Sequence, residues 1–163
     1  MLKIIKEYLQ ENDWQFTQVK DKDIFLFGIA GKNGNFQCIA DIVEDEHKFI
    51  FFSVYGANVP PEKRPQLLEL INYLNVNFFV GNFEMDYQDG EIRYRTGVYL
   101  EFIIPNKNML DQLIMTNIIT MDKYLPALTG VMFGGLSTLQ AIDLVDKSEA
   151  INFEIEKLPS PKI

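Results

Sequence analysis

The sequence predicts an α+β domain in which an antiparallel sheet of about five strands is packed by helices. Three apolar runs joined by turn signals, at 22–30, 35–44 and 48–55, predict a three-stranded meander, and 81–96 predicts a separate hairpin. Helical patterns lie at the N-terminus, between the two strand groups and over the C-terminal third. Strands and helices are therefore partly segregated along the chain, which is typical of α+β proteins.

Length and composition indicate one globular domain, for which we expect residues 1–147, followed by a C-terminal tail over 148–163. The 163 residues are 47% apolar and 13% aromatic, which is enough for a hydrophobic core without disulfides or metal. The net charge of −8 disfavours nucleic acid and anionic membranes as partners. A single cysteine and the absence of a long apolar N-terminal run predict a cytoplasmic protein.

The first element is an amphipathic helix over 2–12, because Leu2, Ile5, Tyr8 and Leu9 recur at helical spacing.

The three-stranded meander follows this helix. A two-residue turn at Asn33-Gly34 predicts the cross-strand pairs Ile29–Cys38, Phe27–Ala40 and Phe25–Ile42. A turn at Asp45-Glu46 predicts the pairs Ile42–Phe49, Ala40–Phe51, Cys38–Ser53 and Phe36–Tyr55. One face is then apolar across all three strands, and the second face is apolar enough to predict a cover on both sides, by helices on one and by a partner or the tail on the other.

A second helix is expected over 65–78, beginning at Pro65. The hairpin after it, GNFEMDYQDGEIRYRT, has an Asp89-Gly90 turn that pairs Glu84 with Arg95 and Asp86 with Arg93. Cross-strand ion pairs of this kind fix the register. The alternative is that Arg93 and Arg95 are anchors for a partner protein.

The C-terminal third is predicted to be helical after Pro105, with Asn106 or Asn108 as the N-cap. Pro126 lacks a backbone donor and predicts a break near 122–125. Gly134-Gly135 should end the next segment.

Ser137 and Gln140 form a capping box for a last helix over 138–146. In the tail, apolar residues alternate over 151–155, which leaves a short strand, a docked arm or disorder open, with fraying expected beyond Leu158.

The stretch 116–136 carries a wider apolar band than one buried face requires. It belongs either to the core or to an oligomer or partner surface. In the second case the candidate contact residues are Tyr124, Leu125, Met132 and Phe133, together with Arg93 and Arg95 of the hairpin.

A search for catalytic and metal-binding patterns returns no site, so no cofactor, metal or catalytic residue is predicted and the chain is not expected to be an enzyme. His47 is the single histidine and lies in a charged turn, and Cys38 falls on the apolar face of the meander. The stretch GIAGKNGN lacks the strand-to-helix context of a phosphate loop. The remaining enzymatic alternative would use Asp86, Arg93 and Arg95.

Two stretches, GNFEMDYQDGEIRYRTGVYLE and NIITMDKYLPALTGVMFGGLSTLQAI, resemble the YbjN-type family of bacterial sensory transduction regulators, over about residues 1–147. That family looks similar in fold to type III secretion chaperones, which are homodimers that bind extended segments of partner proteins. The resemblance implies regulation and brings no catalytic residues with it.

The function expected from the sequence is a non-catalytic, protein-binding regulator or chaperone-like adaptor, homodimeric, in bacterial signalling or stress response. The identity of its protein partner is open. The alternative is a small-ligand sensor whose pocket is lined by the aromatic side chains Phe27, Phe51, Tyr55, Phe83 and Tyr87.

Overall fold

A six-stranded antiparallel sheet, in the order β1-β2-β3-β4-β6-β5, forms the centre of the computed structural model, which describes residues 1–156 and the side chains of residues 1–147. The α+β class is confirmed, with one strand more than expected. The extra strand has two residues, too few to show an alternating pattern. The strands are β1 (Thr17–Gln18), β2 (Ile24–Ala30), β3 (Asn35–Val43), β4 (Lys48–Tyr55), β5 (Asn82–Met85) and β6 (Ile92–Tyr99).

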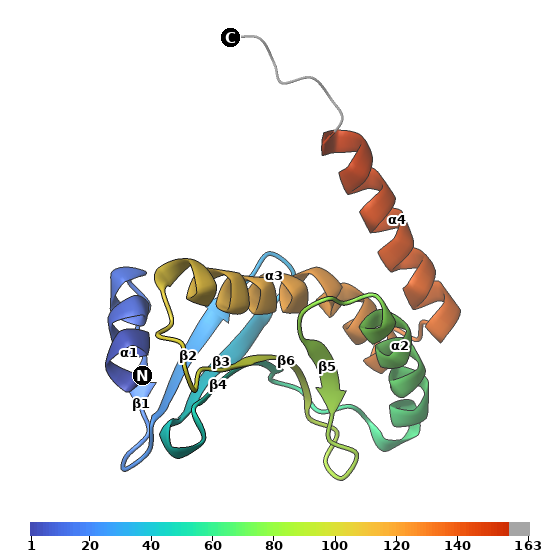
Figure 1. Cartoon of the computed structure of the whole chain (residues 1–163). Helices are drawn as coiled ribbons and strands as arrows, with labels where there is room; N and C mark the ends of the chain where they lie inside the picture. Colours follow the sequence, from blue (N-terminus) through green and yellow to red (C-terminus); the bar gives the residue numbers. More distant parts are fainter. Residues whose placement is uncertain (157–163) are drawn as a thin grey trace.

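Four helices accompany the sheet: α1 (Leu2–Glu11), α2 (Arg64–Val76), α3 (Lys107–Met132) and α4 (Thr138–Glu156). Figure 1 shows α3 lying across one face of the sheet, with α1 and α2 towards its two ends and α4 projecting away from the body. We call the face against α3 the inner face. On the opposite, outer face no helix of the described residues lies over the sheet, so the helices cover one side, as predicted, and a cover of the other side by a partner or the tail stays a prediction.

The register of the meander agrees with the prediction in one hairpin and differs in the other. Between β3 and β4, the pairs Ile42–Phe49 and Ala40–Phe51 are confirmed. Between β2 and β3, Phe27 lies opposite Cys38 rather than Ala40. The cause is a four-residue loop over 31–34, closed by a hydrogen bond from the Gly31 N–H to the Gly34 carbonyl of 2.9 Å. A shift by two residues keeps every side chain on its predicted face.

The β5–β6 hairpin is also shifted by two residues, because its loop is longer than the predicted two-residue turn. Glu84 lies opposite Arg93, and Asn82 lies opposite Arg95. The Asp86 N–H donates to the Glu91 carbonyl at 2.9 Å and closes the loop. The predicted pair of Asp86 with Arg93 is therefore wrong.

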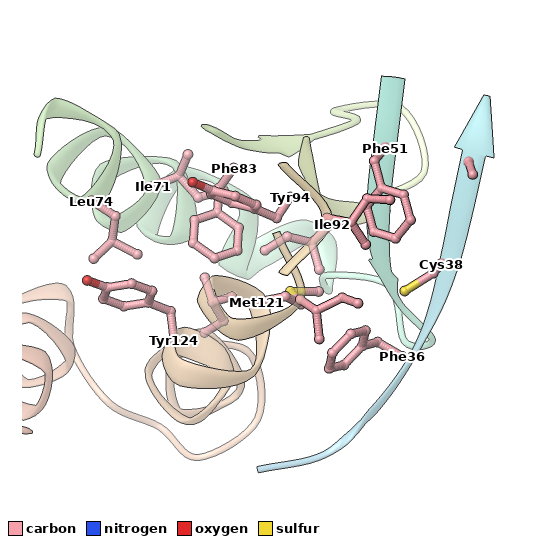
Figure 2. Close-up of a cluster of buried hydrophobic side chains, with 14 of the residues drawn as sticks. Phe36, Cys38, Phe51, Ile71, Leu74, Phe83, Ile92, Tyr94, Met121 and Tyr124 are labelled. Carbon is pink, nitrogen blue, oxygen red and sulfur yellow. The ribbon is translucent and has the colours of Figure 1, made fainter. Parts of the chain in front are cut away.

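The inner face of the sheet and α3 enclose the core. Phe25, Phe49, Phe51 and Tyr94 are fully buried. Figure 2 shows side chains from α2, α3 and the strands converging there, with Tyr124 directed towards the rings of the hairpin. The ring centroids of Tyr124 and Phe83 are 6.1 Å apart. Aromatic packing of this kind dominates the burial of apolar area in a core.

The fully buried side chain of Asn117 ties α3 to the sheet. Its Nδ2 donates to the carbonyls of Phe51 and Tyr94, each at 3.0 Å, and to the Thr96 hydroxyl at 3.2 Å. These bonds satisfy the donors of the buried amide, whereas its Oδ1 has no hydrogen-bond partner, and they fix the position of the helix over β4 and β6.

Helix α3 is continuous from Lys107 to Met132, so the predicted break near 122–125 is wrong. Pro126 cannot donate to the carbonyl of Asp122, four residues earlier. That carbonyl instead accepts from the Asn33 side-chain amide at 3.0 Å. The helix continues because the β2–β3 loop supplies the missing donor.

The helix termini follow the predicted caps. The Asn106 side chain accepts from the Met109 N–H at 3.0 Å. The capping box is confirmed: the Ser137 N–H donates to Gln140 Oε1 at 2.8 Å, and the Gln140 N–H donates to the Ser137 hydroxyl at 3.3 Å. Helix α4 runs on to Glu156, so the backbone is helical over 151–155, where a strand was one option. The fraying expected beyond Leu158 lies outside the described residues.

Candidate interaction site

The outer face of the sheet presents apolar side chains to the solvent. Ile39, Ile50 and Phe52 are half-buried, and Leu26 is 40% exposed. They come from three neighbouring strands, and alternation places them opposite the core side chains of the same strands. An apolar sheet face without a cover within its own chain is typical of an interaction surface.

Beside these side chains lies an arginine cluster, which we define as Glu84, Glu91, Arg93 and Arg95. The Glu84 carboxylate pairs with both arginines: Oε2 lies 2.9 Å from Arg93 Nε, and Oε1 lies 2.8 Å from Arg95 Nε. Glu91 lies 3.5 Å from Arg93. Glu84 pairs with two arginines because it lies opposite one and diagonal to the other.

Phe52 connects the arginine cluster to the apolar residues. The Arg93 guanidinium carbon lies 4.9 Å from the centre of the Phe52 ring. Stacking on an aromatic ring and pairing with carboxylates both restrict an arginine side chain, so less entropy is lost when a partner binds. Sequence analysis missed Phe52 because its contact depends on the pairing of β4 with β6, which joins segments distant in the chain.

The loop of the hairpin is fixed to the segment before α2. The Arg64 guanidinium donates to the carbonyls of Val59, Tyr87 and Gln88. Gly90 has φ of +85°, and a Cβ there would lie 2.4 Å from the Val59 carbonyl oxygen. The Asp-Gly pair therefore marks a docked loop, which holds β5 and β6 in place.

Of the six predicted contact residues, three are accessible. Arg93 and Arg95 are on the outer face, and Phe133 is 56% exposed at the end of α3. Tyr124, Leu125 and Met132 are at most 7% exposed and belong to the core, which is a correction to the predicted surface. The structure does not bring Phe133 to the arginine cluster. Phe133 lies at the end of α3, on the inner side of the sheet, whereas Arg93 and Arg95 lie on its outer face.

Apart from Ile119 and Phe133, which are more than half exposed, the large apolar residues of the 116–136 band serve close packing. Leu125 lies so near the β2–β3 loop that a Cβ on Gly34 would meet its Cδ2 at 2.5 Å. Gly130 likewise makes room for Leu136, whose side chain would lie 2.5 Å from a Cβ there. The width of the band reflects contacts with the loop and with α4 as well as with the sheet.

A hollow of about 670 Å³ lies between the β2–β3 loop, α3 and α4. At its side the Asp122 carboxylate accepts from the backbone N–H groups of Lys32 at 3.1 Å and Asn33 at 2.8 Å. Its other walls include the aliphatic side chains of Ile118 and Leu144 together with Lys123. Sequence analysis missed this contact, although the Asn-Gly pair and the Asp of the MDKYLP motif are its signals.

The aromatic pocket of the sensor alternative is not formed. Phe27, Phe51 and Phe83 are packed into the core at 7%, 0% and 2% exposure, whereas Tyr87 is 60% exposed. Tyr55, at the end of β4, is half-buried. The five rings therefore do not line a common cavity.

The groups considered for catalysis do not converge. The Asp86 carboxylate accepts from the Gln88 N–H at 2.8 Å within the hairpin loop. The carboxylate that pairs with both Arg93 and Arg95 is that of Glu84. Burial raises the pKa of the Cys38 thiol to about 12, against a smaller lowering by its contact with Ser53. His47 is exposed in the β3–β4 turn. Among the residues whose side chains are described, no three His, Cys, Asp or Glu side chains gather as metal ligands.

No helix within the described part of the chain is long and apolar enough to cross a bilayer.

Comparison with known proteins places this fold in a family. The family profile of YbjN, described as "Putative bacterial sensory transduction regulator", matches residues 2–130. The crystal structure of YbjN from E. coli, described as a putative transcription regulator, has a TM-score of 0.58 at 12% identity, covering 75% of this chain and 86% of that one. This likeness shows a shared fold. No curated protein matches the sequence. Because the profile matches most of the chain, the protein belongs to the YbjN family.

Proposed function

We propose that the protein is a non-catalytic, protein-binding regulator of the cytoplasm that acts as a chaperone-like adaptor in bacterial signalling or stress response. The observation that carries the proposal is the outer face of the sheet, where Ile39, Ile50 and Phe52 adjoin arginines that are already held in position. Aromatic and arginine side chains in a rigid setting are those enriched in binding hot spots.

The chemistry of the arginine cluster suits recognition better than reaction. Both carboxylate oxygens of Glu84 are engaged by guanidinium groups, so neither is presented to a substrate. The guanidinium groups of Arg93 and Arg95 retain free donors for carboxylates or carbonyls of a partner. The family description as a regulator supports this proposal.

The test is affinity capture from the native host at natural expression, with mass spectrometry, comparing the wild type with Arg93→Ala/Arg95→Ala. We expect the double variant to lose a specific partner and to lose less than about 1 kcal/mol of stability per exposed ion pair. The matched control is Lys3→Ala/Lys147→Ala, which removes the same charge from exposed helical pairs elsewhere.

Retention of the same proteins by the wild type and the double variant would show that the outer face is not the binding site. Capture of no protein above background would count against a protein-binding role altogether. The melting temperature of each variant separates loss of binding from loss of folding.

A small-ligand sensor remains the second candidate function, but it would use the aliphatic hollow beside Asp122, since the aromatic pocket is not formed. The hollow is open between α3, α4 and the β2–β3 loop. A ligand there would rigidify this loop, so a thermal-shift screen against metabolite pools would reveal it.

A further inference from the structure

Gly97 interrupts the row of side chains that β6 presents on the outer face. It lies opposite Ile50 of β4, and strand pairing continues on both sides of it without a bulge. Its φ is not positive, so the backbone conformation does not require glycine there. A Cβ at this position would lie 3.2 Å from the Phe49 carbonyl oxygen, which asks for a small adjustment of the strand. A glycine within a strand lowers its stability and often marks a place where a ligand approaches closely.

The missing side chain leaves a hollow of about 470 Å³, which we call the Gly97 recess. Along β6 the recess is bounded by Arg95 and Tyr99. Across the strands it is bounded by Ile50 of β4 and by Asn82 of β5. The backbone of Gly97 forms its floor. Its volume falls in the range of about 300–1,000 Å³ that is typical of ligand pockets.

The walls of the Gly97 recess combine an aromatic ring with cationic groups. The Tyr99 ring is 65% exposed, and the Lys48 ammonium group lies 5.3 Å from the centre of that ring and pairs with Glu46. Arg95 gives its Nε to Glu84, and its two terminal nitrogen atoms bond to no described residue. Among the described residues that line the recess, none is acidic. A carboxylate in the recess would therefore meet the free donors of Arg95 and no carboxylate in the walls.

The recess continues into the apolar part of the outer face. Arg95 lies opposite Phe52, Phe52 lies opposite Ile39, and Ile39 lies opposite Leu26. Neighbouring strands are about 4.8 Å apart, so this row is about 14 Å long. A small molecule in the recess leaves the row uncovered, whereas a polypeptide segment covers the recess and the row together. This continuity favours a protein as the occupant.

The chemistry of the recess indicates which side chains of a partner enter it. A flat aromatic ring packs well over a glycine of a strand, and here it would also contact the Tyr99 ring and the Ile50 side chain. A carboxylate next to that ring would reach the terminal N–H groups of Arg95, which can donate to both of its oxygens.

We propose that the partner protein places an aromatic side chain in the Gly97 recess and a neighbouring aspartate or glutamate on Arg95, with apolar residues beyond them on Phe52 and Ile39. The segment that this protein recognises is therefore both acidic and aromatic. The inference rests on the proposed function, because it names the chemistry of the partner that the outer face binds.

Selection from a random peptide library displayed on phage tests this chemistry without knowledge of the partner. The library is first depleted on Gly97→Val, in which the added side chain fills the recess, and the remaining peptides are then selected on the wild-type full chain. We expect the enriched peptides to share an aromatic residue with an aspartate or glutamate close to it in sequence. No enrichment, or enrichment of peptides that lack either feature, overturns the proposal.

The most strongly enriched peptide then serves as the probe in isothermal titration. Gly97→Val should raise its dissociation constant at least about tenfold, because the aromatic anchor loses its pocket. Gly28→Val is the matched control. It adds the same side chain to the outer face of β2, outside the recess, and nothing lies within 4 Å of a Cβ there. The control should bind the peptide as tightly as the wild type does.

A second variant keeps the test decisive if Gly97→Val does not fold. Tyr99→Ala removes an exposed wall of the recess and should raise the dissociation constant of the peptide about two- to tenfold. A peptide that binds the recess variants as tightly as it binds the wild type overturns the proposal. Tighter binding of indole-3-acetate than of any selected peptide also overturns it, since the recess would then belong to a small aromatic acid.

Failure of this inference differs from failure of the proposed function. The proposed function is lost if Arg93→Ala/Arg95→Ala captures the same host proteins as the wild type. If that double variant loses its partner while Gly97→Val retains it, the outer face binds a protein but does not use the recess.

Discussion

At the scale of single residues, Gly90 has the most constrained role. Its φ of +85° lies in the region that side-chain-bearing residues avoid, and the Val59 carbonyl occupies the place of a Cβ. Glycine is needed here because the loop is docked.

We therefore expect Gly90→Ala to lower the free energy of unfolding by about 1–3 kcal/mol in urea denaturation. Gly56→Ala is the control: nothing lies within 4 Å of a Cβ there, and its φ is not positive. It should leave stability unchanged or raise it by up to about 1 kcal/mol. Equal effects of the two substitutions would show that the loop is not held as described.

Cys38 illustrates how burial decides reactivity. Its thiol pKa is raised to about 12 from an ordinary value of 9.0, chiefly by burial. The thiol is neutral in the native and the unfolded state below pH 9, so the contribution of its raised pKa to stability is fully present there. As the pH rises from 9 towards 12, the unfolded state loses the proton first and the contribution is lost.

At pH 8 the native thiol should react with Ellman's reagent on the order of 100-fold more slowly than in urea. Gln37→Cys in a Cys38→Ala background places a thiol at the adjacent exposed position and should react at the unfolded rate. Rapid reaction of native Cys38 would mean that this part of the sheet opens readily.

At the scale of elements, the β2–β3 loop and α3 depend on each other. Pro126 leaves the Asp122 carbonyl without a helical donor, and Asn33 replaces it. The hydrogen bond joins two elements that are otherwise independent in the sequence.

A double-mutant cycle measures this dependence. Asn33→Ala should cost about 0.5–1.5 kcal/mol in the wild type, because it leaves the carbonyl without a partner. In a Pro126→Ala background the backbone N–H at position 126 can take the carbonyl, so the same substitution should cost less. An equal cost in both backgrounds would contradict the assignment.

The elements also show what sequence patterns can and cannot specify. Alternation placed the residues of β2 and β6 on the correct faces, because a face depends on period alone. The register of both hairpins differed by two residues, because Asn-Gly and Asp-Gly were assumed to form two-residue turns. In the fold these dipeptides belong to longer loops that bind Asp122 and Arg64 respectively, and local sequence does not encode such distant partners.

At the scale of the whole molecule, the α+β class and the helix caps followed from the sequence, whereas the outer face did not. Apolar residues on both sides of the meander indicated two covers, and the chain's described part supplies one. Hydrophobicity shows that a face needs a partner but not whether that partner belongs to the same chain. The same ambiguity explains Tyr124, Leu125 and Met132, which were candidates for a surface and lie in the core.

The bond between Asn33 and the Asp122 carbonyl spans 89 positions of the chain, which has a consequence for the order of folding. The part of α3 before Pro126 can form from local contacts, but the helix becomes continuous only when the β2–β3 hairpin is in place. We expect the last turns of α3, and α4 behind them, to form late. A nascent chain would then expose its sheet before its final helices are in place.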